Sequence, residues 1–160
     1  MSQIERIFLD TSFFIRLLDN QDEHHANAVG YYQRWIADGT SLFSSTIVMA
    51  EFGVQADLGN FPARGLTTLA FDASHAAQTA IFAKAAFAAR RKGIISLDHR
   101  NVIPNDTKLI AQAHTVGAEY LAGRDQNLKA VLHFLQQQGL TSVQYLDITT
   151  PAAEFFGELF

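Results

Sequence analysis

Four acidic residues of this 160-residue sequence stand where a carboxylate can serve a reaction. They are Asp10, Glu51, Asp106 and Asp125. Asp10 and Asp125 each follow a short apolar stretch typical of a buried strand, and each precedes a helical pattern. Ligands of open α/β sheets bind at the carboxyl ends of the strands. We therefore expect the four side chains to converge at one edge of a sheet.

A cluster of this kind has a specific chemistry. Two carboxylates about 4 Å apart repel each other by roughly 4 kcal/mol at an effective dielectric constant of about 20. Several of them stay ionised together only beside cations, and an all-oxygen ligand set selects Mg²⁺ or Mn²⁺. Such ions activate water and stabilise charge on a phosphoryl group. Thr11 and Ser12, next to Asp10, are expected to orient metal-bound water or to form hydrogen bonds near the phosphate.

Glu51 is the most informative of the four acids. A helix is predicted to begin after Ser45, with a core stripe formed by Ile47, Val54 and Leu58. Glu51 lies in the middle of that stripe. A carboxylate on an apolar face is rarely buried unless it is paired or bound to a metal. The alternative is a glutamate at the edge of the stripe that extends into solvent.

The three aspartates also have structural alternatives. Asp106 faces the same way as Leu109 and Ile110 of a predicted helix, but the helix dipole favours an aspartate in the first turn in any case. Asp10 and Asp125 stand where an aspartate can cap the helix that follows. We therefore expect either capping residues or metal ligands at these positions.

Alternating strands and helices must position these side chains. The predicted strands are 4–9, 41–44, 119–122 and 142–147, and 66–71 is strand, loop or helix. The predicted helices are 12–18, 22–38, 46–58, 74–92, 105–116 and 125–138, with Gly39 as a stop and Ser74 as a cap. This alternation predicts an α/β fold with a mainly parallel sheet and helices on both faces.

The composition limits the class of protein. With 48% apolar residues, we expect a single domain spanning residues 1–160. The absence of cysteine excludes disulfides, thiolate zinc sites and thiol nucleophiles. A net charge of −4 argues against a protein that merely coats nucleic acid. It does not exclude a nuclease, because bound cations reverse the field of an acidic site.

Other sites and locations are less favoured. No pair of histidines has the spacing of a helical zinc site, and Ser12 lacks the surroundings of a nucleophilic serine. We see no signal peptide and no apolar run long enough to span a membrane, so a cytoplasmic protein is expected. Arg124, beside Asp125, should lie at the rim of the expected metal site and is the preferred phosphate contact.

Four segments resemble the PIN-domain ribonucleases. They are 8–15, which opens with Phe-Leu-Asp-Thr-Ser; 44–52, which carries Glu51; 105–121, which begins Asn-Asp; and 124–128, which begins Arg-Asp. Their order and spacing extend over nearly the whole chain. The resemblance is greatest to the VapC-type toxins of VapBC toxin–antitoxin pairs.

This resemblance implies a three-layer α/β/α fold and a metal-dependent endoribonuclease. The four acids would bind Mg²⁺ or Mn²⁺, and water would attack an RNA phosphodiester. It also implies a homodimer and a cognate antitoxin as partner. Two features depart from the family pattern. Gly123 replaces a threonine or serine, and the loop 93–104 is long enough to contribute specificity or a metal contact through Asp98.

Two alternative functions stay open. The Gly123 departure is compatible with a catalytically inactive PIN-like module that serves as a binding partner or scaffold. A Mg²⁺-dependent phosphatase with Asp10 as its nucleophile is less favoured, because position 12 is a serine and not a second aspartate.

Overall fold

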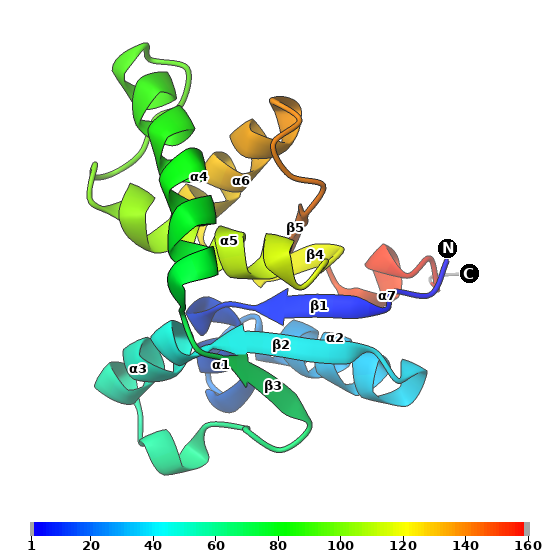
Figure 1. The fold of residues 1–160 in the computed structure, drawn as a ribbon. Coiled ribbons are helices and arrows are strands. Elements are labelled where there is room, and N and C mark those ends of the chain that lie inside the picture. Colours follow the sequence, from blue (N-terminus) through cyan, green and yellow to red (C-terminus); the bar gives the residue numbers. More distant parts are fainter. Residues whose placement is uncertain (1, 159–160) are drawn as a thin grey trace.

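The computed structural model of the chain describes residues 2–158 and contains one five-stranded sheet (Figure 1). The strands are β1 (Arg6–Leu9), β2 (Ser41–Ser45), β3 (Leu66–Leu69), β4 (Tyr120–Gly123) and β5 (Gln144–Asp147). Their order is β3-β2-β1-β4-β5, and every neighbouring pair is parallel. The predicted α/β class is confirmed, and the segment after residue 65 is a strand.

Seven α-helices and one short 3₁₀-helix surround the sheet in the described part of the chain. They are α1 (Thr11–Leu18), α2 (His25–Asp38), α3 (Thr46–Gln55), η1 (Leu58–Asn60), α4 (Ala73–Arg91), α5 (Val102–Thr115), α6 (Gln126–Gln137) and α7 (Ala152–Phe155). Helices α4, α5 and α6 pack on one another, and α1 packs on α2 and α3. None of the described helices combines the length and apolarity that crossing a bilayer requires.

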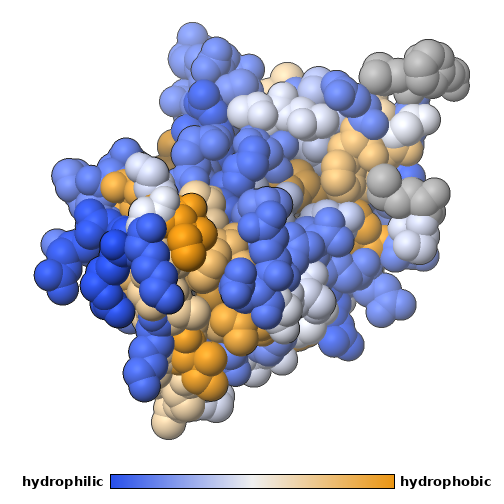
Figure 2. Space-filling model, turned by 90° about the horizontal axis from the view of Figure 1, so that it is seen from above, coloured by the Kyte–Doolittle hydropathy of each residue, from blue (hydrophilic) through white to orange (hydrophobic). Residues whose placement is uncertain are grey.

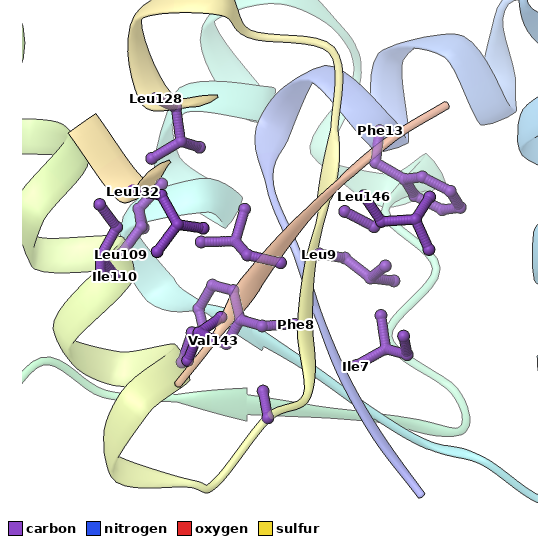
Figure 3. Close-up of a cluster of buried hydrophobic side chains, with 14 of the residues drawn as sticks. Ile7, Phe8, Leu9, Phe13, Leu109, Ile110, Leu128, Leu132, Val143 and Leu146 are labelled. Carbon is purple, nitrogen blue, oxygen red and sulfur yellow. The ribbon is translucent and has the colours of Figure 1, made fainter. Parts of the chain in front are cut away.

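The central strand β1 is buried on both faces. Ile7, Phe8 and Leu9 are fully buried, as expected for a strand covered by helices on either side. Because successive side chains of a strand alternate, Phe8 lies with side chains of α5 and α6, whereas Ile7 and Leu9 lie on the other side with Phe13 of α1 (Figure 3). The sheet is therefore the middle layer of three.

The path of the chain creates one special position in the sheet. From β1 the chain moves outward through β2 to β3, and then returns to β4 on the other side of β1. The crevice at the carboxyl ends of β1 and β4 is therefore the topological switch point, where open α/β sheets bind their ligands. The register pairs Leu9 with Ala122, which brings the residues after both strands together.

Several predicted helix boundaries are wrong for local reasons. Helix α2 begins at His25 because the Asp22 carboxylate accepts a hydrogen bond from the His24 amide and holds a turn there. Helix α3 ends at Gln55 because Asp57 forms a similar turn with the Gly59 amide. Gly39 ends α2 as predicted, with a positive φ of 72°.

The starts of α4 and α5 also differ from the prediction. Asp72 and not Ser74 caps α4, and the serine hydroxyl instead donates to the Asp72 carboxylate. A charged acceptor at a helix N-terminus is favoured by the helix dipole. Helix α5 begins at Val102 because Pro104 is tolerated in a first turn, where its missing N–H has no partner to lose. The loop before α5 is correspondingly shorter than expected.

Polar side chains cover much of the face that Figure 2 shows, with smaller hydrophobic patches between them. The large hydrophobic residues that are exposed are Leu18, Ile36, Val54, Leu58, Ile81 and Ile94. Two of them, Val54 and Leu58, were predicted to belong to the core.

Candidate metal centre

Asp10 and Asp125 lie at the switch point, as predicted. Asp10 directly follows β1, is only 3% exposed, and its backbone amide donates to the carbonyl of Ala122 at 3.2 Å. Asp125 follows β4 by two residues and begins α6. The parallel pairing of the two strands places both acids at the same edge of the sheet.

Both aspartates also cap helices. The Oδ1 atom of Asp10 accepts from the Phe13 amide at 2.9 Å, and Oδ1 of Asp125 accepts from the amides of Asn127 and Leu128 at 2.9 and 3.1 Å. A carboxylate has two oxygens, and each cap uses Oδ1 alone. Capping and metal binding are therefore compatible, because Oδ2 of each residue is left for a second purpose.

Glu51 reaches this edge, although the predicted core stripe of its helix is wrong. Val54 is 86% exposed and Leu58 is 45% exposed, and the residues that α3 buries are Val48 and Phe52. The helix is apolar on nearly every side, so helical spacing alone did not reveal the buried face. Glu51 is half-buried and its Oε2 accepts a hydrogen bond from the Thr11 hydroxyl.

Asp106 arrives from α5 on the inward face, as its spacing from Leu109 and Ile110 predicted. Its side chain is 8% exposed. The Oδ2 atom of Asp106 is buried and has no hydrogen-bond partner among residues 2–158. Such an atom is costly to bury unless a further group binds it.

The four acids line one cavity of about 210 Å³, together with Thr11, Ser12, Val102, Asn105, Leu109 and Leu128. The predicted convergence is thus present in the structure. Burial raises the pKa of Asp106 to about 8, and the charges of Asp125, Asp10 and Glu51 add to this effect. Burial likewise raises the pKa of Asp10 to about 7, and the Asp125 charge contributes.

The residues present fit a hard divalent cation. The donors are all oxygen atoms, one buried oxygen of Asp106 is unpartnered, and burial, with the charges of neighbouring acids, raises the pKa of Asp10 and of Asp106. Within residues 2–158, no three acidic or histidine side chains are close enough to enclose a metal ion directly. Mg²⁺ usually keeps several waters and uses one or two carboxylates, so a cavity of this size suits it better than a closed cage.

The hydroxyl residues beside Asp10 are bonded to protein groups. Ser12 Oγ donates to Oδ1 of Asp10 at 2.6 Å and accepts from the Arg124 amide at 2.7 Å. Thr11 donates to Glu51. Their role toward metal-bound water stays a prediction, but both side chains line the cavity.

Two further residues lie near the acids, Tyr145 and Arg16. The Tyr145 hydroxyl on β5 accepts a hydrogen bond from the Asp125 amide at 2.7 Å, and it lies 20 residues away along the chain. Arg16 lines a neighbouring groove of about 480 Å³, which shares Thr11, Ser12, Glu51 and Asp125 with the acidic cavity. Arg16 Nε is buried there without a partner among the described residues.

Arg124 and Asp98 are directed elsewhere. Arg124 Nη1 lies 3.7 Å from the Glu23 carboxylate, and its side chain lines neither of the two cavities. The Asp98 carboxylate accepts from the Asn127 side-chain amide at 3.0 Å, so it closes the loop over the start of α6 and does not line the acidic cavity. A larger groove along α6 and β5, of about 570 Å³, contains none of the four acids.

The chain is similar to a known protein family and to several solved structures. Residues 7–133 match the profile of the PIN domain family. No curated protein sequence matches the chain significantly.

Solved structures with this fold include VapC20 of Mycobacterium tuberculosis, described as a sarcin–ricin loop cleaving toxin. It has 16% identity and a TM-score of 0.55, and the match covers 86% of this chain and 98% of that one. VapBC2 of Rickettsia felis, bound to a fragment of its promoter DNA, gives 15% identity, a TM-score of 0.55 and coverages of 89% and 98%. DNA-bound VapBC of Salmonella typhimurium has 19% identity and a TM-score of 0.52, and the match covers 91% of this chain and 99% of that one.

These three solved structures are each below 20% identical to the chain, and they establish the fold. The family profile covers most of the chain, from β1 into α6, and includes all four acids. The chain therefore belongs to the PIN domain family.

Proposed function

We propose that this protein is a metal-dependent endoribonuclease that hydrolyses RNA phosphodiester bonds. The observation that carries the proposal is the single cavity lined by Asp10, Glu51, Asp106 and Asp125 at the switch point of the sheet. Membership of the PIN domain family supports it. The pKa values of Asp10 and Asp106, raised mainly by burial and further by neighbouring acids, are typical of functional sites and support the proposal.

In this proposal the four acids hold Mg²⁺ or Mn²⁺ partly through metal-bound water, since no three of them are close enough to enclose the ion directly. Asp10 and Asp125 present Oδ2 while Oδ1 is held by a helix N-terminus, which restricts the rotation of both carboxylates. Asp106 presents its unpartnered Oδ2, and Glu51 is held in place by the Thr11 hydroxyl. When bound, the metal lowers the pKa of water and stabilises the charge on the phosphoryl group.

The substrate class is inferred from the relatives and from the neighbouring groove. VapC20 is described as cleaving the sarcin–ricin loop, which is an RNA. The groove that continues from the acidic cavity is bordered by Arg16, whose Nη1 donates to the Ser12 carbonyl and whose Nε is unpartnered. A guanidinium there can bind a phosphate of the strand beside the scissile bond. Arg16, more than Arg124, is placed for this contact.

The test of the proposed activity is RNA cleavage with Mg²⁺ or Mn²⁺, with EDTA and with Asp106→Asn. Cleavage is expected only with metal and only in the wild-type protein. Asparagine keeps the size of the side chain but removes the charge that binds a cation. Metal-independent cleavage that survives Asp106→Asn would overturn the proposal.

The RNA contact is tested by comparing Arg16→Gln with Arg124→Gln. Loss of a charge-assisted phosphate contact weakens binding by about 1.5–3 kcal/mol, which raises KM by about ten- to a hundredfold. We expect this for Arg16→Gln and a much smaller effect for Arg124→Gln. Equal KM values for the two variants would place the phosphate elsewhere.

We infer that a cognate antitoxin regulates the protein, because the Rickettsia felis and Salmonella typhimurium relatives are VapBC complexes. Co-purification with the product of an adjacent small gene, with loss of cleavage in the complex, is the expected result. The alternative is an inactive PIN-like scaffold. Calorimetric titration with Mn²⁺ separates the two functions, because a scaffold has no need to bind the metal.

A further inference from the structure

Gly123 makes an unusually close approach to the candidate metal centre. A Cβ atom built on Gly123 would lie 2.2 Å from both carboxylate oxygens of Asp10 and 2.3 Å from its Cγ. These separations are far shorter than any van der Waals contact. The Asp10 carboxylate therefore occupies the space in which every other residue at position 123 would place its side chain.

Asp10 cannot move aside without losing contacts. It is 3% exposed, and its Oδ1 accepts both from the Phe13 amide and from Ser12 Oγ. Rotation of the carboxylate away from residue 123 would break the cap of α1 and the bond to Ser12. The cost falls on a buried acid, where lost hydrogen bonds are not replaced by water.

Ser12 connects two of the strand ends. Its hydroxyl donates to Asp10 Oδ1 at 2.6 Å and accepts from the Arg124 amide at 2.7 Å, so one side chain joins the residue after β1 to the loop that carries Asp125. The residues joined by the second of these bonds are 112 positions apart in the chain. The hydroxyl thus determines how Asp10 is oriented relative to the next acid.

We propose that Ser12 and Gly123 act together as positioning residues for Asp10: Gly123 leaves the space for its carboxylate, and Ser12 holds that carboxylate against the β4–α6 loop. The inference rests on the proposed metal-dependent function. It assigns Ser12 a task that acts through Asp10 and Asp125. It also makes the glycine at position 123 a requirement of this site.

The first experiment compares Ser12→Ala with Ser74→Ala by calorimetric titration with Mn²⁺. Ser74 is a matched control, because its hydroxyl also donates to the capping aspartate two residues earlier, at 2.7 Å, at the start of α4 and outside the acidic cavity. Loss of a group that orients a metal ligand weakens metal binding by about ten- to a hundredfold. We expect this for Ser12→Ala and wild-type affinity for Ser74→Ala and Ser12→Thr.

Two readouts separate positioning from folding. The unfolding temperature of each variant in EDTA measures the metal-free protein, and the electron paramagnetic resonance spectrum of bound Mn²⁺ reports the ligand geometry. Ser12→Ala is expected to change the spectrum, whereas a lower unfolding temperature with an unchanged spectrum would mean that Ser12 has only a structural role.

The second experiment concerns Gly123 and keeps the proposal testable if Ser12→Ala is unstable. Gly123→Ala is expected to weaken Mn²⁺ binding at least as much as Ser12→Ala. In the double variant Ser12→Ala with Gly123→Ser, a hydroxyl returns to the site but the close contact with Asp10 is created, so affinity is expected to stay low. Recovery of wild-type affinity by the double variant would overturn the inference.

The remaining outcomes are distinct. If the wild-type protein binds Mn²⁺ and both Ser12→Ala and Gly123→Ala bind it equally well, the positioning role is wrong and the proposed function stands. If the wild-type protein binds no Mn²⁺, the proposed metal-dependent function is wrong, and the inference falls with it.

Discussion

Asp10 and Asp72 occupy similar positions relative to a strand and a helix, but their pKa values are shifted in opposite directions. Each follows a strand, caps a helix through Oδ1, and accepts a hydrogen bond from a serine hydroxyl two residues later. Asp72 is exposed, and the Ser74 hydroxyl and the amides of the helix lower its pKa. Asp10 is buried, and burial raises its pKa to about 7 in spite of the same bonds.

The difference between the two residues shows which surroundings make a capping aspartate a candidate metal ligand. The cap is a local device that any exposed helix can use, and it favours the charged carboxylate. At the switch point, Asp10 is buried and lines a cavity together with three further acids. The same residue type then lies beside other acids, where the proposed divalent cation would compensate their charge.

The largest expected contrast between these two residues is in activity. Asp10→Asn and Asp72→Asn both keep a good capping residue, so their folds are comparable. Because loss of several kcal/mol of charge stabilisation corresponds to about a thousandfold in rate, Asp10→Asn is expected to lower metal-dependent RNA cleavage by at least that factor. Asp72→Asn is expected to cleave at the wild-type rate.

Single-turnover cleavage with saturating Mg²⁺ measures this contrast. The unfolding temperature in EDTA is the control for both variants. Equal loss of activity in both would show that the shared cap, and not the site at the switch point, is what cleavage needs.

Asp10 and Asp72 are expected to contribute to the pH dependence of the free energy of unfolding with opposite signs. The pKa of an unfolded aspartate is about 3.9. With the pKa of Asp10 raised to about 7 and that of Asp106 to about 8, the metal-free native state binds more protons than the unfolded state at intermediate pH. Its free energy of unfolding should therefore fall as pH rises through this window, by up to about 1.4 kcal/mol per pH unit for each carboxyl group.

Asp72 contributes in the opposite direction. Because its folded-state pKa is lowered, the stability that it supplies is present above the unfolded value of about 3.9 and is lost as pH falls through the folded value. Urea unfolding in EDTA between about pH 5 and about pH 8 tests the Asp10 contribution. In Asp10→Asn, the free energy of unfolding should depend less on pH, and added Mn²⁺ should reduce its fall in the wild-type protein. A wild-type free energy of unfolding that does not change with pH in this window would contradict the raised pKa values.

The smallest expected effect is on the cap itself. Asp72→Ala removes the acceptor of the Ser74 and His75 amides, and this loss of a helix cap lowers the unfolding temperature by about 2–4 °C. Asp72→Asn should recover most of that loss. Differential scanning calorimetry compares the three proteins, and a much larger loss in Asp72→Ala would mean that this cap supports more than its own helix.

Local patterns were sufficient for much of the fold and for the choice of acids. Alternating strands and helices, with Asp10 and Asp125 after two strands and Asp106 on an inward face, follow from residue spacing that depends only on neighbours along the chain. The family assignment agrees with the resemblance of the four segments. The helix starts were less accurate, because competing turns at Asp22 and Asp72 differ by small energies.

The sequence by itself thus determined which residues carry charge, where strands end, and that the acids gather at one edge. Only the tertiary structure decided that α3 buries Val48 and Phe52 and leaves Val54 exposed, that Ser12 bonds to Arg124, and that Gly123 lies against Asp10. The physical reason is that strand register and helix packing join segments more than 100 residues apart. No periodicity within one segment contains that information.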